Sequence, residues 1–121
     1  MSDQGDIKNC IEAYYQALRT SSSDKIQSVF HPSARITGYL PDGLHEMSLD
    51  EFSGFVEAQQ PSPEQSGEQS MMEILSCEVA GETAGVRLRE FHLGMVFVDT
   101  LSMLKVDDER RIYNKLFHVE S

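Results

Sequence analysis

The stretch Thr83–Val119, TAGVRLREFHLGMVFVDTLSMLKVDDERRIYNKLFHV, decides the fold of this chain. It contains three segments rich in strand-forming residues, at positions 85–92, 96–105 and 111–119. The first segment alternates apolar and polar side chains, and an acidic turn separates the last two. This pattern predicts three consecutive antiparallel strands, and residues 70–80 predict one more strand before them.

The N-terminal half of the chain predicts three helices. Apolar residues at helical spacing predict a helix from about Asp3 to Arg19, and a short helix follows over residues 24–29. The third helix begins at Ser48, which forms a capping box with Glu51, and it ends near residue 60.

A small hairpin and a loop complete the predicted elements. Residues 34–40 and 44–47 predict two short strands joined by a turn, and residues 61–69 predict a mobile loop without a packing face, a lid or a tether. Helices gathered at the start and strands at the end predict an α+β fold, with helices on one face of a curved sheet. We expect a single domain spanning residues 1–121.

Charge and hydropathy exclude some classes of function. The 121 residues carry a formal net charge of −10, and no lysine or arginine occurs between Arg35 and Arg87. Nucleic-acid binding is therefore disfavoured, because it depends on basic side chains that neutralise phosphates. No apolar run is long enough to span a bilayer and the first residues do not resemble a signal peptide, so we expect a cytoplasmic protein without a membrane partner.

Glu90 and His92 extend a row of core residues along the strand predicted at 85–92. Every second residue of a strand lies on the same face, so Glu90 and His92 share a face with Val86 and Leu88 and follow directly after these two core-facing residues. Because unpaired buried charge is costly, the two residues suggest an acid and a base lining a pocket mouth. The alternative is that the row leaves the core at Leu88, or that a bulge flips the register, and both residues face solvent.

Asp99 and Lys115 form a second candidate pair on the last two strands. A tight turn in the acidic segment places Leu101 opposite Lys115, so that Asp99 lies diagonally across from the lysine. Tyr113 and Phe117 share the parity of Lys115 and are predicted on the same face. The pair is either the polar part of an apolar cavity or a structural salt bridge at the sheet surface or a dimer interface.

Aromatic residues of the helices are further candidates for a ligand pocket. Tyr14 and Tyr15 lie on the inner edge of the first helix, where each hydroxyl either donates into a pocket or is satisfied in the core. His31, at the helix-to-strand corner, is a pocket residue or a local cap. Phe52 and Phe55 belong to the buried stripe of the third helix.

Metal and redox chemistry have no support in the sequence. The four histidines form no short-spaced pair, and no motif for a cofactor is present, so neither a metal nor a cofactor is predicted. Cys10 and Cys77 form no Cys-x-x-Cys pair. Cys77 shares strand parity with Leu75 and Val79, which predicts a buried structural thiol.

Four motifs together resemble the nuclear transport factor 2-like superfamily along essentially the whole chain, nearest to small bacterial proteins of the lumazine-binding and SnoaL-like groups. The motifs are Ile11-x-x-Tyr14-Tyr15, residues 29–36 (VFHPSARI), residues 97–106 (FVDTLSMLKV) and residues 112–117 (IYNKLF). The resemblance implies a cone-shaped, strongly curved antiparallel sheet wrapped by three helices, a cavity between them, and a homodimer formed through the outer face of the sheet. Asp99 and Lys115 match a recurring pattern of the group.

Two positions depart from relatives of this superfamily. The ketosteroid isomerases have a catalytic aspartate shortly after the strand that aligns with Ala34-Arg35-Ile36, and Gly38 occupies that position here. Many relatives also have a tryptophan in the last hairpin, where this chain has Arg110. The shared scaffold therefore transfers no particular reaction.

Three hypotheses of function remain open at this stage. The leading one is a protein that binds a small apolar or aromatic molecule, with a pocket formed by Tyr14, Tyr15, His31, Phe52, Phe55, Asp99, Lys115 and Phe117. The second is an isomerase, dehydratase or polyketide cyclase that transfers protons through Asp99, or through Glu90 with His92. The third is a non-catalytic interaction module whose acidic middle third contacts a basic partner.

Overall fold

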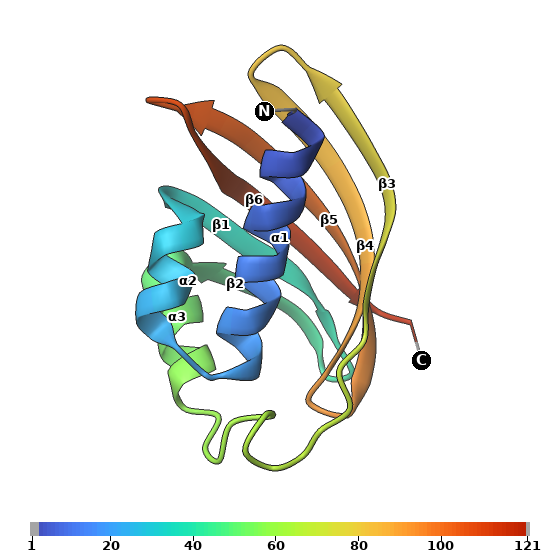
Figure 1. Ribbon diagram of the computed structural model, residues 1–121. Helices are drawn as coiled ribbons and strands as arrows, with labels where there is room; N and C mark the ends of the chain where they lie inside the picture. Colours follow the sequence, from blue (N-terminus) through green and yellow to red (C-terminus); the bar gives the residue numbers. More distant parts are fainter. Residues whose placement is uncertain (1–2, 121) are drawn as a thin grey trace.

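The computed structural model describes residues 3–120 and contains three helices and six strands. In chain order the elements are α1 (Asp3–Arg19), α2 (Ser23–Val29), β1 (Phe30–Leu40), β2 (Gly43–Ser48), α3 (Leu49–Glu57), β3 (Met72–Ala80), β4 (Thr83–His92), β5 (Met95–Val106) and β6 (Glu109–Val119). The predicted α+β class and the arrangement of helices before a strand meander are confirmed. The sheet curves around the helices, which lie on its concave side (Figure 1).

The strands form a single sheet in the order β2-β1-β6-β5-β4-β3. Every neighbouring pair is antiparallel except β1 and β6, which run parallel, so the sheet is mixed. Hairpin turns impose antiparallel pairing on strands that are consecutive in the chain. The β1–β6 pair has no such turn, because the two strands come from opposite ends of the sequence.

The local start signal of α3 is confirmed. The Ser48 hydroxyl accepts a hydrogen bond from the Glu51 backbone N–H at 3.2 Å, and the Glu51 carboxylate accepts one from the Ser48 N–H at 2.9 Å. These two bonds satisfy backbone donors that the first turn of a helix leaves without partners.

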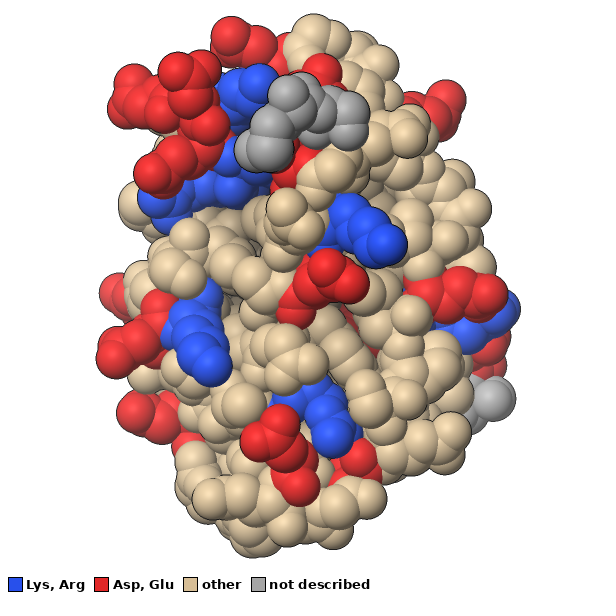
Figure 2. Space-filling view, in the orientation of Figure 1, with Lys and Arg blue, Asp and Glu red and all other residues tan. Residues whose placement is uncertain are grey.

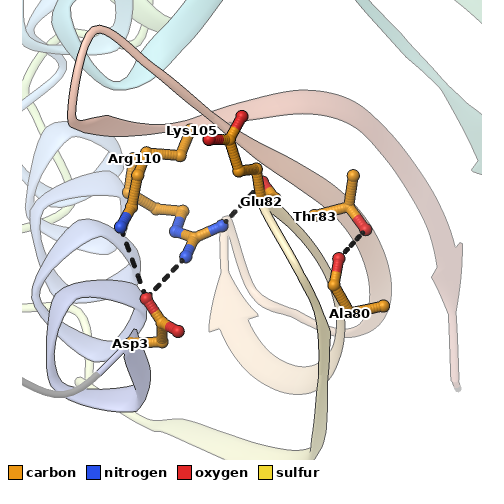
Figure 3. Close-up of polar contacts among 6 residues, drawn as sticks. All are labelled: Asp3, Ala80, Glu82, Thr83, Lys105 and Arg110. Carbon is orange, nitrogen blue, oxygen red and sulfur yellow. Dashed lines mark hydrogen bonds and ion pairs between the residues drawn. The ribbon is translucent and has the colours of Figure 1, made fainter.

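Charged side chains attach the start of α1 to the strand turns at one end of the sheet (Figure 3). The Asp3 carboxylate accepts hydrogen bonds from Lys105 and Arg110, each at 3.4 Å. Arg110 also donates to the backbone carbonyl of Glu82 at 3.1 Å. Arg110, which stands where many relatives have a tryptophan, therefore links α1 to the β3–β4 turn.

Two β-bulges overturn parity predictions made from the sequence. In β6 the register shifts at Tyr113, whose side chain is 36% exposed and lies off the face of Lys115. In β3 the shift falls at Leu75, which is exposed and does not share the face of Cys77. Cys77 and Val79 pair with the buried Val86 and Ala84, but on this edge strand Cys77 is only half-buried and Val79 is exposed. An extra residue in a strand reverses the direction of the side chains beyond it, and strand periodicity does not reveal where that residue lies.

The loop between α3 and β3 packs on the molecule, contrary to the expectation that it has no packing face. Ser62 is buried, and the Glu68 carboxylate accepts hydrogen bonds from the backbone N–H groups of Leu93 and Gly94 at 3.1 and 2.9 Å. Arg19 of α1 donates to the Glu68 carbonyl. These contacts are made between backbone and distant side chains, so the polar composition of the loop did not predict them.

Candidate ligand-binding cavity

A cavity of about 220 Å³ opens at the end of the sheet that holds the β4–β5 turn. Its walls come from α1, α3, β1, β2 and the inner face of β4, β5 and β6. The lining comprises four phenylalanines (Phe52, Phe55, Phe97, Phe117), five aliphatic or sulfur-containing residues (Leu18, Leu40, Met47, Leu93, Met95) and four polar residues (His45, Glu90, His92, Lys115). The cavity is therefore mainly apolar, with a small number of titratable groups.

Strand parity explains why the polar groups lie inside. The β4–β5 pairing has no register shift, so the inward row of Leu88 continues to Glu90 and His92. These two residues are 1% and 7% exposed, which excludes the alternative that the row turns to solvent. In β5 and β6 the predicted register is confirmed, because Leu101 pairs with Lys115.

Four polar side chains meet at the polar end of the cavity, where two of them line it and two lie behind the wall. The Lys115 ammonium donates to the Tyr14 hydroxyl at 2.5 Å, and that hydroxyl lies 2.7 Å from Glu90 Oε2 and 3.1 Å from Asp99 Oδ2. The ammonium also lies 3.9 Å and 4.0 Å from the same two carboxyl oxygens. All four side chains are buried, so their charges must balance one another.

The cluster favours the protonated form of Glu90. Burial first, and then the neighbouring Asp99 charge and a hydrogen bond with Asp99, raise the pKa of Glu90 well above its ordinary value. Burial and the two carboxyl groups likewise raise the pKa of Tyr14. Both shifts favour the protonated forms of Glu90 and Tyr14 beside Asp99 and Lys115.

Aromatic rings surround the ammonium of Lys115. It lies 4.9 Å from the centres of the Tyr14 and Phe52 rings and 5.6 Å from that of Phe117. Cation–π attraction compensates part of the hydration that the ammonium loses on burial.

His92 is a neutral histidine at the same end of the cavity. Burial, helped by the positive charges of Lys115 and Arg19, lowers its pKa from 6.5 to about 4. Its Nδ1 is buried without a hydrogen-bond partner, as is Glu90 Oε1. Unpaired buried polar atoms are uncommon in folded proteins, and two of them beside one cavity point to a ligand or water as partner.

Gly38 stands at the position that aligns with the catalytic aspartate of the ketosteroid isomerases, and the structure leaves no room for a side chain there. A Cβ atom at Gly38 lies only 2.2 Å from the Phe117 carbonyl oxygen and 2.4 Å from its ring. The space beside Gly38 is thus taken by Phe117, a wall of the cavity, and a side chain there has no room.

The structure brings together most of the residues singled out from the sequence. Phe52, Phe55, Glu90, His92, Lys115 and Phe117 line the cavity, and Tyr14 and Asp99 stand one layer behind it. Tyr15 lies elsewhere, since its hydroxyl donates to the Phe91 carbonyl and accepts from the Met71 N–H. His31 lies outside the cavity, packs on Tyr113, and accepts from the Ser33 N–H, as a local cap does.

Several lining residues were missed in the sequence. Phe97 shares the parity of Asp99 in β5, so the same argument that selected Asp99 also indicates Phe97. Leu93 and Met95 flank the β4–β5 turn, and Met47 closes the cavity from β2. No sequence signal marks these three, because the approach of β2 and the turn to the same space is a tertiary property.

On the face shown in Figure 2, the charged side chains of the described residues do not gather into a basic patch. Acidic and basic side chains are interspersed there. Within residues 3–120 no helix is both long and apolar enough to cross a membrane, and no group of three potential metal ligands is found.

Solved structures identify the class of fold. A nuclear transport factor 2-like protein of unknown function from Silicibacter pomeroyi is 22% identical, with a TM-score of 0.86 over 99% of this chain and 100% of that one. A similar protein from Methylobacillus flagellatus is 22% identical, with a TM-score of 0.85 over 98% and 93%. At this identity the similarity shows the fold, which is nuclear transport factor 2-like.

The family follows from the sequence match. The chain belongs to the family described as “Putative lumazine-binding”, whose model matches residues 2–118. No curated protein matches the chain.

Proposed function

We propose that this protein binds a small, largely apolar molecule in the cavity at the β4–β5 end. The proposal is carried by one observation. The cavity has apolar walls, and two buried polar atoms at its polar end, Glu90 Oε1 and His92 Nδ1, have no hydrogen-bond partner. Apolar walls with a few placed polar groups are typical of sites for small molecules.

The size of the cavity limits the ligand to about one or two rings. An apolar cavity of about 150 Å³ is enough to bind benzene, and this cavity measures about 220 Å³. The four phenylalanine rings favour a flat molecule that packs against them. Lumazine, which the family description names, is a flat two-ring heterocycle and belongs to this size class.

The binding function can be tested with benzyl alcohol and 1-naphthol as probes, measured by ligand-observed NMR. Met95→Trp places a larger side chain in the cavity and is expected to abolish binding, whereas the exposed control Val106→Trp keeps it. Equal binding by the wild type and the Met95→Trp protein contradicts the proposal.

Proton-transfer catalysis is the second candidate function, and the raised pKa of Glu90 favours it. A carboxyl group that lines a cavity and has a raised pKa is suited to act as a general acid. In this case Asp99→Asn removes the neighbouring charge and is expected to abolish turnover while the fold persists. Unchanged turnover in that variant contradicts the role of Asp99.

We also propose that two copies associate through the outer face of the sheet. Leu116 and Tyr39 are each 54% exposed on that face, beside a shallow groove formed by Arg87, Val98 and Thr100. Exposed apolar patches of this kind commonly mark interaction surfaces. Light scattering is expected to give twice the chain mass, reduced to the monomer by Leu116→Lys but not by Leu75→Lys. A monomeric wild type contradicts this assembly.

A further inference from the structure

We propose that the natural ligand of the cavity is a cation: a compound of one or two rings that carries a protonated nitrogen, placed against Glu90. This inference rests on the proposed binding function and specifies the charge class of the ligand. It follows from the number of buried charges, from the atoms that remain without partners, and from the aromatic walls.

The buried cluster contains more acidic groups than basic ones. Glu90 and Asp99 provide two carboxyl groups, whereas Lys115 provides the only ammonium in contact with them among the described residues. His92 is neutral near neutral pH, so it adds no positive charge. The raised pKa of Glu90 favours a proton on its carboxyl group, which supplies the missing positive charge. A cationic ligand can take the place of that proton and leave the cluster electrically neutral.

The unpaired polar atoms beside the cavity can accept hydrogen bonds from a ligand that carries a donor group. Glu90 Oε1 becomes an acceptor when the carboxyl group ionises, and a neutral imidazole offers one acceptor nitrogen. Lys115 is not similarly free, because its ammonium already donates to Tyr14 and is surrounded by three rings. An anionic ligand would therefore meet carboxyl oxygens, with the Asp99 charge directly behind them.

The walls and the overall charge also favour a cation. Phenylalanine rings attract cations through their faces, and Phe55 and Phe97 remain available in the cavity beyond the rings around Lys115. The net charge of −10 raises the concentration of small cations near the protein surface.

The proposed binding step has a defined proton balance. A ligand that is already protonated in solution binds as the cation, the Glu90 carboxyl group loses its proton, and one proton is released to the solvent. A neutral ligand of the same shape leaves Glu90 protonated, and no proton is released.

Three probes of nearly equal size separate the possible charge classes: benzylammonium, benzyl alcohol and benzoate. Isothermal titration calorimetry at pH 7, in two buffers with different ionisation enthalpies, measures both affinity and proton release. We expect benzylammonium to bind at least tenfold tighter than the other two and to release about one proton per molecule bound.

Glu90→Gln provides the matched variant, because glutamine still accepts from Tyr14 but cannot ionise. Benzylammonium affinity is expected to fall at least tenfold, a larger fall than that of benzyl alcohol, and its proton release is expected to be lost; the exposed control Glu78→Gln changes neither affinity nor proton release. Far-UV circular dichroism verifies that the variant folds, and proton release by the wild type tests the inference independently.

The outcomes distinguish this inference from the proposed function on which it rests. If benzyl alcohol or benzoate binds as tightly as benzylammonium, or no proton is released, the cavity still binds small molecules but the cation inference is overturned. If none of the three probes binds, the cation inference fails and the proposed binding function loses its support as well.

Discussion

Acidification is predicted to destabilise the fold through His92. The buried imidazole has a pKa of about 4 in the folded protein, compared with 6.5 for an ordinary histidine. A lowered pKa means that the unfolded chain binds a proton more readily than the folded one. The stabilising contribution is therefore complete above pH 6.5 and is lost as the pH falls towards 4.

The magnitude follows from these two pKa values. The full displacement corresponds to about 3 kcal/mol of unfolding free energy. Between pH 7 and pH 5, where the unfolded histidine becomes protonated and the folded one does not, the loss is about 2 kcal/mol. His92→Phe removes the titrating group while keeping an aromatic ring of similar size.

Urea denaturation at pH 7 and pH 5 tests this reasoning. The wild type is expected to lose about 2 kcal/mol more stability between the two pH values than His92→Phe does. Other titrating groups, Glu90 included, are present in both proteins and cancel in this difference. His118→Phe replaces an exposed histidine and serves as the control that keeps the wild-type behaviour. An equal loss in the wild type and in His92→Phe refutes the assignment of His92 as a buried neutral imidazole.

Three further predictions concern stability. The raised pKa of Glu90 means that the stabilising contribution of this group is lost as the pH rises from the ordinary value of 4.5 to the raised one, so Glu90→Gln should lose less stability than the wild type between pH 5 and pH 9 in urea titrations. Gly38→Ala should lower the unfolding free energy by about 2–3 kcal/mol through its collision with Phe117, whereas Gly54→Ala, in open space within α3, should raise it by roughly 0.5–1 kcal/mol. Ser48→Ala should cost about 1 kcal/mol because the α3 cap is lost, and thermal melts of each variant check these signs.

At the polar end of the cavity, the same residues lower the stability of the fold and favour ligand binding. His92 and Glu90 have unpaired buried atoms, which lower the stability of the empty protein. A site that retains such groups gains hydrogen bonds when a ligand arrives. We therefore expect a ligand to raise the melting temperature, and a tighter ligand to raise it more at the same concentration.

Local patterns in the sequence were sufficient for the elements and for part of the site. Helical spacing defined α1, the Ser48–Glu51 capping box defined the start of α3, and strand alternation put Glu90 and His92 in the row of Leu88 and Asp99 in the row of Leu101. These features depend on neighbours within a few residues, or on a turn that sets the register of a hairpin, so the sequence alone determines them.

Only the tertiary structure decided the remaining features. The bulges at Tyr113 and Leu75, the parallel β1–β6 pair and the attachment of Glu68 to the β4–β5 turn depend on contacts between distant segments. The raised pKa of Glu90 has the same origin, because it requires burial beneath α1 and the charge of Asp99 on the adjacent strand. Alternation along a strand tells which side chains share a face, but the direction of that face, the distances between the side chains and the water that they lose are set only when the segments pack together.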